Sequence, residues 1–171
     1  MARKRRKKDV PAKGRLRDFA DKLWSLAVKD DWGCKCAICG RRGSGPDLTK
    51  GLNSHHLVPR QHKATRYVLE NGICLCRPCH VFDANHSPHQ HPAGFLEWLE
   101  KNHPSRIQWL RDNVHPRFDG VANEFWYIDQ IVELALHVDE EDLVQIIGVK
   151  FHADTIFDLV ESRVAQLDAT E

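Results

Sequence analysis

The residues best suited to chemistry are cysteines and histidines that fall in two short stretches of the chain. Cys36 and Cys39 form one C-x2-C pair, and Cys76 and Cys79 form a second. Each pair places two sulfur atoms on one tight turn, so that four thiolates can share a tetrahedral ion at about 2.3 Å. Four thiolates leave no position open for a substrate, which is typical of structural zinc. The sequence therefore predicts a Zn²⁺ site that contributes directly to folding.

The two remaining cysteines, Cys34 and Cys74, each precede a pair by two residues. C-x-C spacing suits a single turn less well, so we expect both to be small buried residues next to the pairs. Competition for the ion and a disulfide between the two are the alternatives. The basic N-terminus lacks the apolar stretch of an export signal, and the six cysteines are clustered rather than spread, so reduced thiolates are expected.

Histidines and an asparagine lie between the two cysteine pairs and directly after the second pair. His55 and His56 are adjacent and are followed by Pro59, whereas Asn71 leads into the second cysteine pair and His80 follows it at once. Adjacent histidines alone would be a weak signal. Their order with the proline, the asparagine and a terminal C-x2-C-H is much more specific.

These residues lie in two segments, SHHLVPR (54–60) and NGICLCRPCH (71–80). The two segments resemble the two motifs of the HNH nucleases, a family with the ββα-metal fold. A looser resemblance, over about residues 16–115, is to phage recombination nucleases of the NinG (Rap) type, a group associated with cutting branched DNA. It is carried by KLWSLAVKDDWGCKCAICG, RQHKATRYVLENGICLC and HPAGFLEWL. The resemblance implies an α+β fold, with a small ββα-metal HNH core on a four-cysteine zinc knuckle, flanked by helices.

The HNH resemblance also implies roles for individual residues in the hydrolysis of DNA phosphodiester bonds with a single divalent ion. His56 falls at the position of the general base, and an unperturbed imidazole titrates near pH ~6.5, so it can accept a proton at neutral pH. His55 and His80 fall at the positions that bind the catalytic Mg²⁺ or Mn²⁺. Asn71 falls at the position that holds the loop presenting His56. We therefore expect the rings of His55, His56 and His80 to surround a common cation, and products with 5′-phosphate and 3′-hydroxyl ends.

The sequence departs from the HNH pattern in two places. His55 stands where many relatives carry a carboxylate, and two imidazoles suit a softer ion than Mg²⁺, so Ni²⁺ or Co²⁺ could also serve. Relatives often carry a further histidine shortly after the C-x2-C-H. Asp83 and His86 lie nearby at a different spacing, and we expect a surface role for both, with outer ligation as the alternative. His89 is expected to be a surface or structural residue.

Charge is distributed unevenly along the chain despite a net charge of only +1. Residues 1–17 hold nine Lys/Arg and one Asp, whereas residues 119–171 hold two Lys/Arg and thirteen Asp/Glu. We expect the basic arm to contact DNA phosphates and so to make binding salt-dependent. Further contacts are expected beside the motifs, where a solvated surface charge is the alternative for any single residue. The predicted phosphate-binding residues are Arg3, Lys4, Arg5, Arg6, Arg60, Lys63, Arg66 and Arg77.

Helices are expected on both sides of the motifs, because apolar residues there recur at helical spacing. The predicted ranges are 16–29, 91–118 with breaks at Pro92, Pro104 and Pro116, 122–137, 140–147 and 155–167. The intervening segment, residues 34–90, is expected to hold turns and short strands. We predict three parts: a disordered basic arm (1–15), a zinc-stapled HNH nuclease domain (16–118), and an acidic all-α extension (119–171).

These features predict a DNA endonuclease, a phosphodiesterase, acting in phage-type DNA recombination or processing. The acidic extension would be repelled by phosphates, so we expect it to bind a protein partner or a second copy of the chain, or to cover the basic face. One alternative is a nuclease subunit docked to a DNA-packaging machine. Another is a catalytically silent zinc-finger module that binds DNA, which would require replacement of His56 or His80. No apolar run approaches the ~20 residues of a membrane span, so we expect no membrane contact and a cytoplasmic protein, in the bacterial host if phage-encoded.

Overall fold

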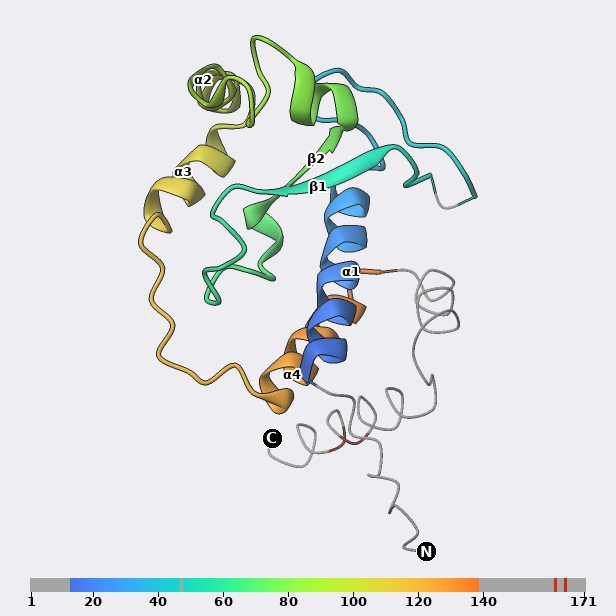
Figure 1. The fold of residues 1–171 in the computed structure, drawn as a ribbon, viewed down its shortest axis with the longest axis vertical. Coiled ribbons are helices and arrows are strands. Elements are labelled where there is room, and N and C mark those ends of the chain that lie inside the picture. Colours follow the sequence, from blue (N-terminus) through green and yellow to red (C-terminus); the bar gives the residue numbers. More distant parts are fainter. Residues whose placement is uncertain (1–12, 47, 139–161, 163–164, 166–171) are drawn as a thin grey trace, which may run out of the picture. The chain divides into compact units, whose positions relative to one another are not determined.

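Helices and one small sheet make up the described chain, which in this computed structural model covers residues 13–46, 48–138, 162 and 165. In order, the elements are α1 (Lys13–Asp31), β1 (Leu52–His56), the short turn of helix η1 (Leu69–Asn71), β2 (Gly72–Cys76), the short helix η2 (Pro78–Phe82), α2 (Pro92–Asn102), α3 (Pro104–Asp112) and α4 (Glu124–Ala135) (Figure 1). The predicted α+β class is confirmed. The helices predicted over 140–147 and 155–167 lie almost entirely outside the described residues, as do Arg3, Lys4, Arg5 and Arg6.

The chain divides into two compact units. Residues 21–120 form one unit, which contains both strands and every cysteine. Residues 1–20 and 121–171 form the other, and its described part is the start of α1 together with α4 and its flanks. Within the described residues, no helix combines the length and the apolar character that crossing a membrane requires.

The two strands pair antiparallel, from Leu52 opposite Cys76 to His56 opposite Gly72. Every residue of β2 is buried, whereas β1 is mostly half-buried. Side chains alternate between the two faces of a strand, so the adjacent residues His55 and His56 leave β1 on opposite faces. The strand therefore presents one imidazole to each of its two sides.

Each face of β1 is covered by a different helix of the same unit. On one face, the Ser54 hydroxyl donates a 2.7 Å hydrogen bond to the Ser25 carbonyl of α1. On the other face, the His55 ring meets the Phe95 ring of α2 edge-on, with 5.9 Å between centroids. The buried apolar cluster beneath this second face draws on β2, α2 and α3, and its members include Ile73, Leu75, Phe95, Leu99 and Ile107.

Two of the three prolines in the predicted helical region 91–118 begin helices. Pro92 and Pro104 occupy the first positions of α2 and α3, where a missing amide hydrogen costs no intrahelical bond. His91 caps α2, because its Nδ1 accepts a hydrogen bond from the Gly94 amide. The region is therefore two helices, and the second of them ends at Asp112, before Pro116.

Helix α1 is anchored to the segment that leads into β2. The indole of Trp24 donates to the Val68 carbonyl at 3.0 Å, and that of Trp32 donates to the Gly72 carbonyl at 3.2 Å. The backbone of Gly72 lies close to the Val28 side chain of α1, because a Cβ atom added to Gly72 would lie 2.2 Å from a methyl carbon of Val28. Glycine is therefore required at residue 72 if α1 is to pack in this position.

Candidate metal centre and active site

Four cysteine sulfurs converge between the first knuckle turn and the end of β2. Cys36, Cys39, Cys76 and Cys79, here called the thiolate cluster, place all their Sγ atoms within 4.8 Å of one another. The Cys39 and Cys76 sulfurs are 3.6 Å apart. Tetrahedral zinc with Zn–S bonds of about 2.3 Å requires an S···S spacing of about 3.8 Å, so the four residues fit this ion. The thiolate cluster is the one that the two C-x2-C pairs predicted.

The other two cysteines lie outside the thiolate cluster, and none of the six forms a disulfide in the structure. Cys74 is fully buried on β2, and burial raises the pKa of its thiol to about 12. Cys34 is half-buried in the turn that follows α1. Cys74 is therefore the small buried residue that its spacing predicted, whereas Cys34 is only half-buried and lies in a turn instead of a strand.

A second group of possible ligands is formed by three histidines. His55, His80 and His89, here called the histidine cluster, place one ring nitrogen each within 4.8 Å of one another. His80 Nε2 lies 3.1 Å from His55 Nδ1 and 3.2 Å from His89 Nε2. One ring nitrogen has either a single proton or a single lone pair, so it cannot form a full hydrogen bond with both neighbours. Both distances fit a metal site, because adjacent nitrogen ligands at ~2.1 Å from an ion would lie about 3.0–3.4 Å apart.

The environment keeps two of these rings ready to bind an ion. Burial, reinforced by the neighbouring histidines, lowers the pKa of His55 to about 3. Burial also lowers the pKa of His80, with a contribution from His89. Both rings are therefore neutral at neutral pH and keep a lone pair for a metal. Three ligands, unlike four, leave coordination positions open for a substrate.

His89 is exposed, as a surface residue is expected to be, but it also lies in the histidine cluster, which the sequence did not predict. Ser87, which is fully buried, ties the loop in place: its hydroxyl donates to the His80 carbonyl at 2.8 Å and accepts from the His89 amide at 3.1 Å. One hydroxyl thus joins two members of the histidine cluster that are nine residues apart in the chain. Asp83 and His86, the alternatives weighed from sequence, lie outside the cluster and face each other at 3.7 Å.

His56, the predicted general base, is not a member of the histidine cluster. It leaves the opposite face of β1, where its Nε2 lies 2.9 Å from the Arg66 carbonyl oxygen. A carbonyl can only accept, so Nε2 carries the proton and Nδ1 keeps the lone pair. Burial lowers the pKa of His56 to about 4, which favours the neutral ring. The expected arrangement of three rings around one cation therefore changes: His55 and His80 gather with His89, and His56 stands on the other side of the strand.

Asn71 is fully buried at the end of η1 and holds the loop that follows β1. Its side-chain amide donates to the Val58 carbonyl at 3.0 Å and to the Thr65 carbonyl at 2.9 Å, and its oxygen accepts from the Val58 amide at 2.6 Å. The two ends of the loop are thereby clamped together. Since Thr65 immediately precedes Arg66, the clamp helps to place the carbonyl that meets His56.

Arg66 does not lie where a phosphate contact would require it. Only 7% of the residue is exposed, and its guanidinium forms a two-pronged ion pair with Asp21 of α1, at 2.9 and 2.6 Å. A third bond, from Nη1 to the Arg60 carbonyl, is 2.8 Å long. The side chain therefore holds the loop to α1. From the sequence, Arg66 was predicted to contact DNA, because an ion pair with a residue 45 positions away cannot be recognised from sequence alone.

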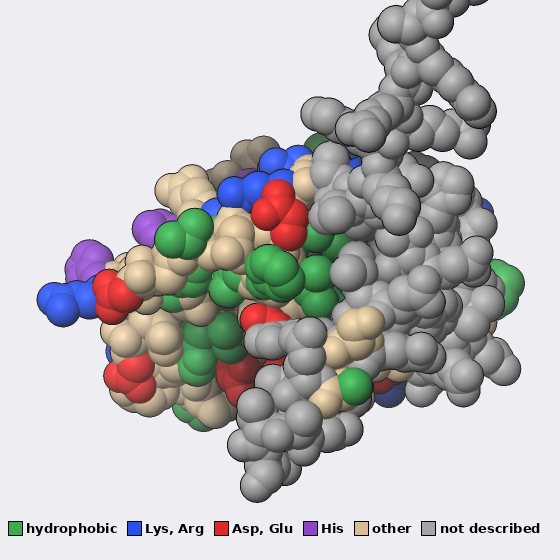
Figure 2. All heavy atoms as spheres, turned by 90° about the horizontal axis from the view of Figure 1, so that it is seen from below, with side chains coloured by type: hydrophobic (Ala, Val, Ile, Leu, Met, Phe, Trp, Pro, Cys, Tyr) green, Lys and Arg blue, Asp and Glu red, His purple; other side chains and the backbone are tan. Residues whose placement is uncertain are grey.

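The other predicted phosphate-binding residues of this unit are more accessible. Arg60 and Arg77 are exposed and Lys63 is half-buried. Arg77 precedes η2, and its guanidinium lies 5.8 Å from the centre of the exposed Phe82 ring. On the face shown in Figure 2, basic and acidic side chains of the described residues are intermingled. The described part of that face therefore shows no continuous basic surface.

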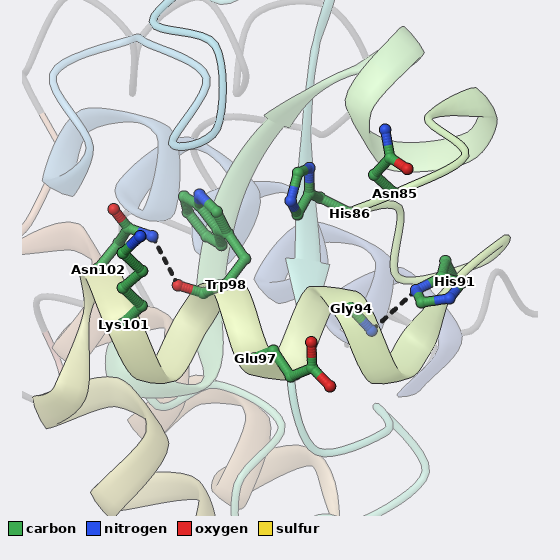
Figure 3. Close-up of a pocket in the computed structure, with 8 residues that line it drawn as sticks. All are labelled: Asn85, His86, His91, Gly94, Glu97, Trp98, Lys101 and Asn102. Atoms are coloured by element: carbon green, nitrogen blue, oxygen red, sulfur yellow. Dashed lines mark hydrogen bonds between the residues drawn. The ribbon is translucent and has the colours of Figure 1, made fainter.

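A pocket of about 630 Å³ lies along α2, bordered by the loop that carries Asn85 and His86 (Figure 3). None of the histidine cluster lines it. Several of its polar groups already serve the fold: His91 caps the helix, and the Asn102 amide donates to the Trp98 carbonyl at 2.8 Å. The pocket is therefore not formed by the residues of the histidine cluster.

Comparison with known proteins gives one match. The searches of curated proteins and of solved structures each found no match. The matching segment covers less than a third of the chain, but it includes the thiolate cluster, Asn71 and two of the three clustered histidines. This segment, residues 36–85, matches the family model of the HNH endonucleases, and the match supports a nuclease.

Proposed function

We propose that this chain is a metal-dependent DNA endonuclease that hydrolyses phosphodiester bonds. The observation that carries the proposal is the histidine cluster, two of whose three members lie in the segment that matches the HNH endonucleases. In this proposal, His55, His80 and His89 hold the catalytic ion and His56 is the general base. The thiolate cluster holds a structural Zn²⁺.

The proposed reaction begins with proton transfer from water to His56. Its Nδ1 has the free lone pair, because Nε2 is bonded to the Arg66 carbonyl. The resulting hydroxide attacks phosphorus, the bond from phosphorus to the 3′ oxygen breaks, and that oxygen leaves and takes up a proton from solvent. When bound, the ion would neutralise charge on the scissile phosphate and on the leaving oxygen. The products would have 5′-phosphate and 3′-hydroxyl ends.

The opposite directions of the two adjacent histidines suit this reaction. In a displacement at phosphorus, the attacking and leaving oxygens stand roughly in line on opposite sides of the phosphorus atom. A base must therefore act on one side of the phosphate and a cation on the other. Consecutive residues of a strand project to opposite sides, as His55 and His56 do on β1.

The ligand set also bears on the choice of ion. Three imidazoles and no carboxylate suit Mn²⁺, Co²⁺ or Ni²⁺ better than Mg²⁺, which prefers oxygen ligands. We therefore propose that Mn²⁺ supports faster cleavage than Mg²⁺ at equal concentration. Titrating cleavage against each ion tests this ranking.

The biological role proposed is phage-type DNA recombination or processing, with branched DNA as the preferred substrate. The support is the resemblance of three segments between residues 22 and 99 to phage recombination nucleases, together with the basic arm at the N-terminus. The acidic residues 119–171 would then bind a protein partner or a second copy of the chain. Purified protein with Mn²⁺ or Mg²⁺, tested on junction, flap, linear and supercoiled DNA, separates this role from general DNA cleavage.

The decisive test of the enzyme is His56→Ala. Loss of a general base is expected to lower the cleavage rate by about 10²–10⁴-fold, while DNA and metal binding remain near those of the unaltered protein. His115→Ala, an exposed histidine beyond α3, is the control and should cut normally. Turnover of His56→Ala near that of the unaltered protein would reject the assignment.

A further inference from the structure

The ring of His56 is covered by a residue from outside the segment that matches the HNH family. Trp24, on α1, stacks on this imidazole with 3.6 Å between ring centroids and 13° between the ring planes. The family match begins at residue 36, so α1 lies before it. The proposed base is therefore in contact with a helix that the family motifs do not include.

The stack and the hydrogen bond of His56 together determine the orientation of its ring. The bond from Nε2 to the Arg66 carbonyl fixes one edge of the ring but allows the ring to swing about that contact. A flat indole at 3.6 Å fixes the plane of the ring. With one edge and the plane both set, the direction of the Nδ1 lone pair is set as well.

The indole is itself firmly held. Trp24 is only 2% exposed, and its Nε1 donates a 3.0 Å hydrogen bond to the Val68 carbonyl. The same helix also secures the other partner of His56, because Asp21 holds the Arg66 guanidinium in the two-pronged ion pair described above. Thus α1 supports both groups that orient the imidazole, through residues three positions apart on one helix face.

We propose that Trp24 is a positioning residue for the general base, which it orients from outside the segment that matches the HNH family. The inference rests on the proposed function of His56. Trp24 acts through the imidazole and does not touch DNA. A smaller aliphatic side chain without a flat face should therefore slow the chemical step and leave DNA affinity unchanged, because small errors in the direction of a reacting group are costly.

The test compares Trp24→Leu and Trp24→Phe in the full-length, zinc-loaded protein with Mn²⁺. For Trp24→Leu, we expect kcat to fall at least about tenfold with KM for DNA unchanged, since leucine cannot stack. Phenylalanine restores a flat face, so Trp24→Phe should recover most of kcat, although neither variant keeps the bond to Val68. The matched control is Trp32→Leu, which removes an indole anchoring the end of α1 through the same kind of bond, to Gly72, without contacting His56. Its kcat should stay within about twofold of the unaltered protein at temperatures where all variants are folded.

A second measurement reports on the stack itself. Proton NMR of the unaltered protein should show the His56 ring protons shifted upfield by the Trp24 ring current, and the shift should disappear in Trp24→Leu but persist in Trp32→Leu. If the unaltered protein cleaves DNA and Trp24→Leu has the same kcat, the positioning role is overturned. If the unaltered protein cleaves no DNA with any divalent ion, the proposed function fails instead. An unshifted His56 in the unaltered protein would remove the geometric basis of the inference.

Discussion

The thiolate cluster and the histidine cluster are adjacent in the chain but differ in the number and kind of their ligands. Cys79 and His80 are consecutive residues at the start of η2, so one short turn contributes to both clusters. The thiolate cluster has four ligands, three of them buried. The histidine cluster has three, and one of these, His89, is exposed. An ion held by the first would have no open coordination position, whereas an ion held by the second would have positions left for a substrate.

The histidine cluster depends on the thiolate cluster for its position. The thiolate cluster joins the knuckle after α1 to the end of β2, and thereby fixes where η2 begins. His80 follows its last ligand directly, so the histidine cluster can form only where the cysteines have placed it. The reverse does not hold, because His55 and His89 come from other segments. Damage to the two clusters should accordingly have unequal consequences.

The largest effect is expected from Cys76→Ser, which removes a thiolate from β2. Structural zinc contributes about 10–16 kcal/mol in small zinc-finger peptides, which matches or exceeds the ~5–15 kcal/mol net stability of an ordinary domain. The variant should lose one equivalent of zinc, its cooperative thermal unfolding and all cleavage. Elemental analysis and circular dichroism measure the first two properties.

Cys34→Ser provides the control, since Cys34 lies two residues before the first pair and outside the thiolate cluster. It should retain zinc and unfold cooperatively. A Cys76→Ser protein that stays folded without zinc would show that the two clusters are not coupled through the shared turn.

A smaller and more selective effect is expected from His89→Ala. The histidine cluster loses its exposed ligand while the thiolate cluster stays intact, so zinc content and stability should change little, within about 0.5 kcal/mol. The affinity for Mn²⁺ should fall at least about tenfold, and excess Mn²⁺ should restore part of the cleavage. Titration of cleavage against Mn²⁺ measures both.

His86→Ala changes a histidine of the same loop that lies outside the cluster, and its Mn²⁺ dependence should be unaltered. Equal Mn²⁺ requirements for the unaltered protein and His89→Ala would limit the catalytic site to His55 and His80.

The difference between the clusters also explains how far the sequence could predict them. Each cysteine pair is local, because two residues separated by two others share a turn whatever the rest of the chain does. The thiolate cluster could therefore be predicted from spacing alone, and the motifs supplied His55 and His80. His89 could not be found in this way, because it reaches the cluster through a loop whose path depends on the buried Ser87. The SPHQHP stretch (87–92) contains two histidines, and the sequence does not show which of them reaches the cluster.

The same limit applies to contacts made across the fold. Helical spacing predicted a helix over 16–29, and α1 is indeed present, two or three residues longer at each end. It could not predict that Trp24 would cover His56 or that Asp21 would take Arg66 away from the surface. These contacts join segments 32 and 45 residues apart, and a charge in a sequence looks the same whether it is paired or solvated.

The smallest effect is expected from Arg77→Gln, in the turn that the two clusters share. Arg77 lies between Cys76 and Pro78 and is exposed, so it can meet a phosphate beside the histidine cluster without contributing to either ion site. One lost phosphate contact should lower the slope of log affinity against log salt by about 0.9, leaving zinc content and kcat unchanged. DNA binding measured from low to moderate salt tests this, with Arg117→Gln, an exposed arginine beyond α3, as the control. If both variants keep the original slope, Arg77 is a solvated charge, and the shared turn serves the ions without touching DNA.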